Sequence, residues 1–258
     1  MEFQLETPAP HVRLLRIDGE QRLNTLRRSM LAELERHVAS IESDADARVV
    51  VLTGAGAKAF CAGADLNERQ GMSVADVRRW LGDLKRTFLG IERSRRVYVA
   101  ALNGAAMGGG CELALACDLR VADPHAALGL PEVKLGILPG AGGVVRLARS
   151  VGQTRAKELI LTGRRVTAAE AAAMGLVNRV SPPGESVSDA LKLAEEIAAN
   201  APLAVASAKD ALREAWDLGL DDALAREHAA YEEILNSTDR LEGLAAFVAK
   251  RKPEYEGR

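Results

Sequence analysis

The sequence predicts an α/β fold, with strands and helices mixed over roughly the first 180 residues and a helical C-terminal region after them. Three observations support this prediction. Short apolar runs alternate with stretches of helical periodicity in the first half. Glycine-bearing turns follow several of these runs. Beyond Gly140 almost every segment has helical periodicity, and a Pro182-Pro183-Gly184 turn precedes the last four helices.

The first half contains four runs that read as strands and three stretches that read as helices. The strands are expected over residues 12–17, 49–52, 97–102 and 119–121. The helices are expected over residues 29–41, 74–94 and 109–117. The first helix shows the pattern best, because apolar residues recur along one face at Met30, Leu31, Leu34, Val38 and Ile41.

The second half is predicted to be helical apart from one strand at residues 176–180. The helices are expected over residues 145–150, 153–161, 168–174, 186–200, 203–218, 220–236 and 240–250. We therefore divide the chain into a core of residues 1–182, which would hold an active site, and a helical region of residues 183–258.

Composition narrows the class of protein. A net charge of −2 gives no general attraction to nucleic acid or to an anionic membrane, so neither is expected as a partner. No apolar run reaches the roughly 20 residues that a membrane-spanning helix needs. The three cysteines, Cys61, Cys111 and Cys117, are odd in number and lack a metal-ligand spacing. They favour reduced thiols in the cytoplasm and no bound metal.

Two glycine-rich segments follow predicted strands. Residues 54–65 have a small-residue backbone that can approach a ligand closely, and Asp65 is placed to cap the next helix. Residues 108–110 are three glycines that open a helix, where free amides can stabilise an anion. The alternatives are a tight surface turn for the first segment and close helix–strand packing for the second. A phosphate-binding P-loop is excluded because Ala59, not Ser or Thr, follows Lys58.

Two glutamates, Glu112 and Glu132, lie in apolar surroundings next to glycine-bearing turns. Glu112 falls in the first turn of the helix that the glycines open, and its neighbours are apolar on nearly every side. We expect it to be buried or to line a cavity, with a raised pKa. Either glutamate alone is compatible with a structural role. As a pair beside two glycine loops, they suggest proton transfer on both sides of a bond.

Three motifs together resemble those of the enoyl-CoA hydratase/isomerase (crotonase) family. They are AFCAGADL at residues 59–66, NGAAMGGGCEL at 103–113 and GLPEVKLGILPG at 129–140. The similarity extends from residues 24–26 to residues 246–251. It implies a ββα spiral core and a C-terminal region, residues 183–258, that forms trimers or pairs of trimers. It also implies an acyl-CoA substrate, with no cofactor other than the coenzyme A that the substrate carries.

The resemblance also implies roles for individual residues. The amides of Ala64 and Gly109 would form an oxyanion hole for the thioester oxygen. Glu112 would act as a base on water, and Glu132 would deliver a proton to the α-carbon. Coenzyme A would lie along Arg22, Leu23, Ala62, Asp65 and Leu66, with Phe247 and Lys250 reaching the coenzyme A of a neighbouring subunit.

Residues 65–69 and 239–247 look closest to the methylglutaconyl-CoA hydratases. The substrate of those enzymes carries a second carboxylate, and Arg69 is placed to bind it through a forked contact. The alternative for Arg69 is a solvated helix arginine. Competing functions are a straight-chain enoyl-CoA hydratase, an isomerase, or a catalytically idle scaffold or RNA binder.

Overall fold

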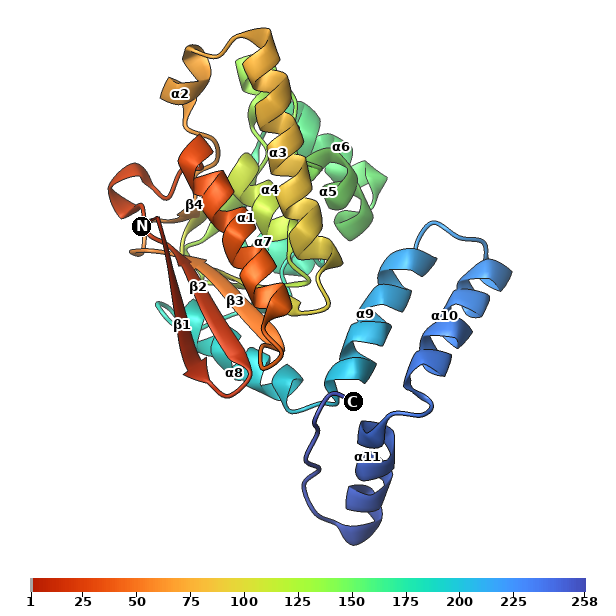
Figure 1. Ribbon diagram of the computed structural model, residues 1–258. Coiled ribbons are helices and arrows are strands. Elements are labelled where there is room, and N and C mark those ends of the chain that lie inside the picture. The colour runs from red at the N-terminus through yellow and green to blue at the C-terminus, as the bar shows by residue number, and fades with distance from the viewer. Residues whose placement is uncertain (1) are drawn as a thin grey trace.

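A six-stranded sheet forms the larger layer of the structure, a computed structural model that describes residues 2–258 (Figure 1). Its strands, in spatial order, are β1 (Phe3–Ala9), β2 (Val12–Ile17), β3 (Val49–Gly54), β5 (Val97–Leu102), β7 (Leu119–Ala122) and β10 (Arg179–Val180). Only the β1–β2 pair is antiparallel. Strands β3 and β5 are buried along their whole length, as their continuous apolar sequences require for parallel strands covered on both faces.

Helices cover both faces of this sheet. The helices α1 (Arg28–Ser43), α3 (Val74–Arg93) and α4 (Gly109–Ala116) share one apolar cluster with alternate residues of β3, including Val50 and Leu52. The intervening residues, Val49 and Val51, face the opposite way and pack with α8 (Ser186–Ala198). The period-two alternation of a strand thus divides the core into two layers.

A second, four-stranded sheet was not predicted from the sequence. It consists of β4 (Ala59–Cys61), β6 (Ala105–Met107), β8 (Ala127–Gly129) and β9 (Arg165–Thr167), in that order. The first three follow β3, β5 and β7 along the chain and are parallel to one another. The glycine-rich segment 54–65 is therefore not one long loop, because β4 lies within it. Strand β1 was also missed.

The predicted helices are found, with ends shifted by a few residues. Those of the second half are, besides α8, the helices α5 (Gly143–Val151), α6 (Gln153–Thr162), α7 (Ala168–Ala173), α9 (Pro202–Ala215), α10 (Leu220–Ile234) and α11 (Thr238–Ala249). Three short helices had no predicted range: η1 (Glu20–Arg22), α2 (Leu66–Gln70) and η2 (Glu132–Leu135). The predicted strand at residues 176–180 shortens to β10. None of the helices described over residues 2–258 combines the length and apolarity needed to cross a membrane.

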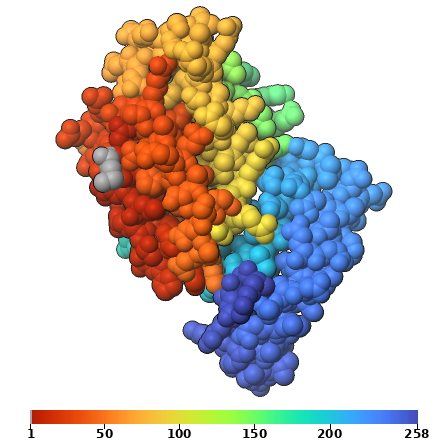
Figure 2. Space-filling model, viewed as in Figure 1, coloured from red at the N-terminus to blue at the C-terminus, as the bar shows by residue number. Residues whose placement is uncertain are grey.

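Helices α9, α10 and α11 form an arm that extends from the body of the molecule, as the blue lobe in Figure 2 shows. Helix α8 does not belong to this arm, because Ala190, Leu193 and Ala194 pack it against the large sheet. The division of the chain after residue 182 stays a prediction. All three cysteines are buried and free, while the compartment inferred from them stays a prediction as well.

Buried asparagines hold the segment that links the two sheets. The side chain of Asn103 donates to the carbonyls of Gly54 (2.9 Å) and Gly56 (2.7 Å) and accepts from the Gly54 amide (3.1 Å). From the other side, Asn24 donates to the carbonyls of Ala55 (3.0 Å) and Ala59 (2.7 Å). These side chains provide hydrogen-bond partners for backbone groups of a turn that has little secondary structure of its own.

We expect Asn103→Ala to lower the free energy of unfolding by about 2 kcal/mol, because it leaves the buried Gly54 amide and carbonyl without partners. The measurement is a urea titration at fixed protein concentration. Asn236→Ala, at an exposed position, is the matched control. Equal stability of the two variants would contradict this account of the turn.

Candidate active site

The amide of Ala64 is left free by the way its neighbours are bonded. The Gly63 carbonyl accepts from the Leu26 amide (2.7 Å), and the Asp65 amide donates to the Leu26 carbonyl (3.0 Å). Because successive amides of an extended chain point to opposite sides, the N–H of Ala64 points away from Leu26. It finds no hydrogen-bond acceptor within residues 2–258.

Gly109, the first residue of α4, brings a second free amide close to the first. A methyl group placed on Gly109 would lie 3.6 Å from the Ala64 nitrogen. The first amides of a helix have no partner inside it, and that of Gly109 finds none elsewhere in the described part of the chain. The helix can approach so closely because its next residue is Gly110, where an added Cβ would lie 2.0 Å from the Cys61 carbonyl oxygen.

Glu112 is buried, as its apolar neighbours in the sequence predicted, with only 3% of its surface exposed. One carboxylate oxygen, Oε1, accepts from the amides of Ala141 (2.7 Å) and Gly143 (2.8 Å). The chain turns between them at Gly142, whose φ of 106° lies in the left-handed region that favours glycine. A loop that ends in the first turn of α5 thus holds the carboxylate.

Glu132 begins η2, and its carboxylate stands over the start of α4. A methyl group placed on Gly108 would lie 3.1 Å from its Oε1. Its Oε2 is buried and has no hydrogen-bond partner among the described residues. A buried oxygen without a donor is costly when charged, so this environment favours the protonated acid.

The two carboxyl groups therefore differ in their electrostatic surroundings. Burial raises the pKa of Glu112, but the amides of Gly143 and Ala141 and the charges of Arg146 and Arg69 oppose the shift. Burial and, to a smaller extent, the charge of Glu112 raise the pKa of Glu132 to about 7, against the opposing effects of its own backbone amide and of Arg69. Glu112 has two amide donors from the 141–143 turn that favour its ionised form, whereas one oxygen of Glu132, Oε2, has no donor.

Five residues expected to contact coenzyme A gather beside the free amide of Ala64. The Ala62 amide donates to the Leu23 carbonyl (3.0 Å), and Arg22 lies 3.6 Å from the Asp65 carboxylate. Asp65 caps α2 by accepting from the Asn67 amide, as the sequence predicted. The next residue, Leu66, is 55% exposed. These side chains thus border an open surface next to the proposed site.

Arg69 lies on α2, close enough to the site for its charge to lower the pKa of both Glu112 and Glu132. Its side chain is half-buried. Over residues 2–258 no carboxylate lies within 4.0 Å of its guanidinium group. A cation near the glutamates and without an ion-pair partner is available to a ligand.

Phe247 and Lys250 are not brought to the site within one chain. Phe247 is 85% exposed near the end of α11, and Lys250 follows that helix. The arm that carries them lies far from α2 in Figure 1. A contact with coenzyme A would have to reach a neighbouring subunit, as the sequence analysis expected.

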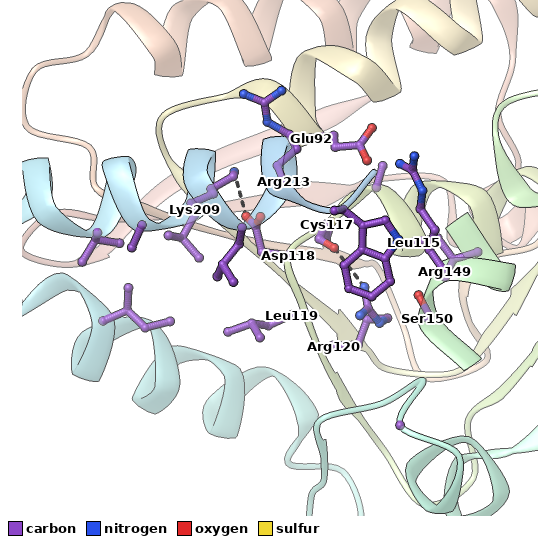
Figure 3. A pocket seen from close by; sticks show the side chains of 18 of the residues that line it. Glu92, Leu115, Cys117, Asp118, Leu119, Arg120, Arg149, Ser150, Lys209 and Arg213 are labelled. Carbon is purple, nitrogen blue, oxygen red and sulfur yellow. Dashed lines mark hydrogen bonds and ion pairs between the residues drawn. The ribbon is translucent and has the colours of Figure 1, made fainter. Parts of the chain in front are cut away.

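A separate cavity of about 720 Å³ lies between α9 and the core (Figure 3). Its lining includes Leu115 and Cys117, at the C-terminal end of α4, and a partly buried ion pair between Lys209 and Asp118 (2.8 Å). Neither Glu112 nor Glu132 lines it. The cavity and the glutamates therefore lie at opposite ends of α4, with the candidate site at the N-terminal end.

Sequence reasoning missed Ala141 and Gly143, whose amides hold Glu112, and Arg146, which binds the Ala141 carbonyl. Arg146 donates to the Ala141 carbonyl (2.7 Å) and to Glu92 (2.7 Å). The sequence does indicate that free amides are available there, because residues 140–143 are a run of small residues directly before a helix. Nothing local in the sequence marks Arg146 as different from the other arginines.

Comparisons with known proteins show the family of the chain. The chain matches the enoyl-CoA hydratase/isomerase family over residues 10–258. It is 41% identical to a short-chain-enoyl-CoA hydratase of Clostridium acetobutylicum, with 94% of this chain and 93% of the relative covered. It is 40% identical to a 2,3-dehydroadipyl-CoA hydratase of Escherichia coli, with 96% of each covered.

The solved structures confirm the fold class. The crystal structure of an enoyl-CoA hydratase from Bacillus anthracis superposes with a TM-score of 0.98, at 45% identity and with 100% of both chains covered. The crotonase-like α/β fold expected from the three motifs is therefore correct. On the family match and on these identities, the chain belongs to the enoyl-CoA hydratase/isomerase family.

Proposed function

We propose that this protein adds water across the 2,3 double bond of a 2-enoyl-CoA, or removes it in the reverse direction. The observation that carries the proposal is the pair of glutamates, one held by amide donors and one with an unsatisfied oxygen, beside two free backbone amides. Groups whose surroundings push their protonation in different directions suit the roles of base and acid. Relatives named as hydratases support the same reaction type.

In this proposal the amides of Ala64 and Gly109 bind the thioester oxygen and stabilise the negative charge that develops on it. Glu112 takes a proton from water as the water oxygen bonds to the β-carbon. The electrons of the double bond move toward the thioester, and Glu132 gives a proton to the α-carbon. Dehydration reverses these steps. No redox change occurs, so the reaction needs no cofactor beyond the coenzyme A of the substrate.

For the acyl group, we propose a substrate with a distal carboxylate, and 3-methylglutaconyl-CoA in particular. Arg69 supports this, because it lies near both glutamates and has no ion-pair partner among residues 2–258. The relative named for 2,3-dehydroadipyl-CoA adds support, since an adipyl group also ends in a carboxylate. A straight-chain substrate is the alternative, favoured by the short-chain relative.

We also propose that the arm assembles trimers, alone or paired. Its helices expose many large apolar side chains, which monomeric proteins rarely gather in one place. They are Leu212, Trp216, Leu220, Leu224, Tyr231, Leu241, Leu244, Phe247 and Val248. Assembly would cover these side chains and carry Phe247 and Lys250 toward a neighbour's coenzyme A.

Glu112→Gln and Glu132→Gln should each lower kcat for crotonyl-CoA hydration by roughly 10²- to 10⁴-fold, because each removes a proton-transfer group. The assay follows loss of the conjugated enoyl absorbance. Glu227→Gln, at an exposed position, should retain full turnover. Intact turnover in the double variant would refute the mechanism.

Arg69→Met should weaken kcat/KM for methylglutaconyl-CoA by about 10- to 100-fold more than for crotonyl-CoA, because loss of the charge shifts the pKa of Glu112 and Glu132 with both substrates, whereas only methylglutaconyl-CoA also loses a charged hydrogen bond. Arg78→Met, an exposed arginine of α3, controls for loss of positive charge. An equal loss of kcat/KM on both substrates would show that Arg69 does not bind the distal carboxylate of the acyl group.

Light scattering should give a mass of three or six times 27.5 kDa for the native protein. The Leu244→Lys/Val248→Lys double variant should shift the mass toward one chain, because it places charge in the apolar face of α11. Val74→Lys, at an exposed apolar position outside the arm, should leave the mass unchanged. A native protein of 27.5 kDa would contradict the proposal.

A further inference from the structure

Arg146 is buried in the wall behind Glu112 and does not touch the carboxylate itself. Its side chain leaves α5 and reaches two partners. One terminal nitrogen, Nη1, donates to the Ala141 carbonyl (2.7 Å). The other, Nη2, donates to Glu92 on α3 (2.7 Å), and Nε donates to the same carboxylate oxygen (3.2 Å). Only 8% of the residue is exposed, so all three donors act in a low-dielectric setting.

The peptide group that Arg146 holds is next to the one that holds Glu112. The Ala141 amide donates to Glu112 while the Ala141 carbonyl accepts from Arg146. The turn is tightly fitted around the guanidinium group, because a methyl group on Gly142 would lie 2.2 Å from Nη1. Moving Arg146 therefore moves the donors of the carboxylate.

We propose that Arg146, fixed by Glu92, is a positioning residue that sets the orientation and the proton affinity of Glu112 through the 141–143 turn. This inference rests on the proposed role of Glu112 as the base. Arg146 acts by two routes. It aims the amides of Ala141 and Gly143, and its charge favours the ionised form of Glu112.

Four groups face Glu112 from the elements packed around it. Arg146 on α5 and Arg69 on α2 lower its pKa, whereas burial raises it. Glu132 on η2 and the thiol of Cys111 on α4 are the other titratable neighbours. Removal of Arg146 takes away one of the two cations that lower the pKa of Glu112, so this pKa should rise. Because the base must be ionised, the acid limb of the pH–rate profile should move to higher pH.

A change at Glu92 can disturb the position of Arg146 without altering Arg146 itself. Glu92 lines the cavity between α9 and the core, at the opposite end of α4 from the active site (Figure 3). Glu92→Gln keeps the shape of the side chain but removes the charge that fixes the guanidinium group. It therefore loosens Arg146 without opening a hole behind Glu112.

The test compares variants in crotonyl-CoA hydration across pH. Arg146→Met should lower kcat roughly 10- to 100-fold with KM changed less than about threefold, because misplaced groups cost turnover more than binding. Its acid limb should shift to higher pH. Arg146→Lys keeps the charge but cannot span both partners, so kcat should fall while the acid limb shifts less than in Arg146→Met. Glu92→Gln should lower kcat in the same direction by a smaller factor.

Arg149→Met is the control, because Arg149 lies on the same helix, is exposed and pairs with the exposed Asp217. It should leave kcat and the pH profile unchanged. If Arg146→Met does not fold, Glu92→Gln decides the question. A folded Arg146 or Glu92 variant with kcat within about twofold of native and an unshifted acid limb would overturn the inference.

Glu112→Gln is measured alongside to separate the two proposals. If it loses turnover while Arg146→Met does not, only the positioning role fails. If Glu112→Gln keeps its turnover, the proposed base and the positioning role fall together.

Discussion

A carboxylate removed from water must find hydrogen-bond donors, and this requirement organises the centre of the molecule. Glu112 meets it with the amides of Ala141 and Gly143. Those amides are available because the chain turns and starts a helix there, and the first amides of a helix have no acceptor within it. The buried carboxylate thus stabilises the 141–143 turn. The amides of that turn, for their part, determine how readily the carboxylate binds a proton.

Backbone amides without acceptors are also found on the other side of the site. The amide of Ala64 is free because its neighbours pair with Leu26, and that of Gly109 is free because it begins α4. Glu132 is the exception, since one of its oxygens finds no donor. The contrast matters because groups whose surroundings push their pKa values apart can serve one as base and the other as acid at the same pH.

The sequence predicted the long elements well because each buries a continuous apolar stripe, as in α1 and α3 or in β3 and β5. It missed the second sheet because β4, β6 and β8 have three residues each, too few to show alternation. Burial of Glu112 followed from its neighbours in the chain. Its donors did not, because they lie 29 and 31 residues away. A contact of Phe247 and Lys250 with coenzyme A would require a second subunit, and the structure of one chain does not describe such a contact.

The tight contact at Gly110 has a consequence for how this chain can evolve. Every glycine codon becomes an alanine codon by one nucleotide change, so this substitution arises often by chance. At Gly110 the new methyl group would meet a carbonyl oxygen at 2.0 Å, and backbone cannot rotate aside as a side chain can. A frequent mutation is therefore poorly tolerated here, and the junction between β4 and α4 is closed to it.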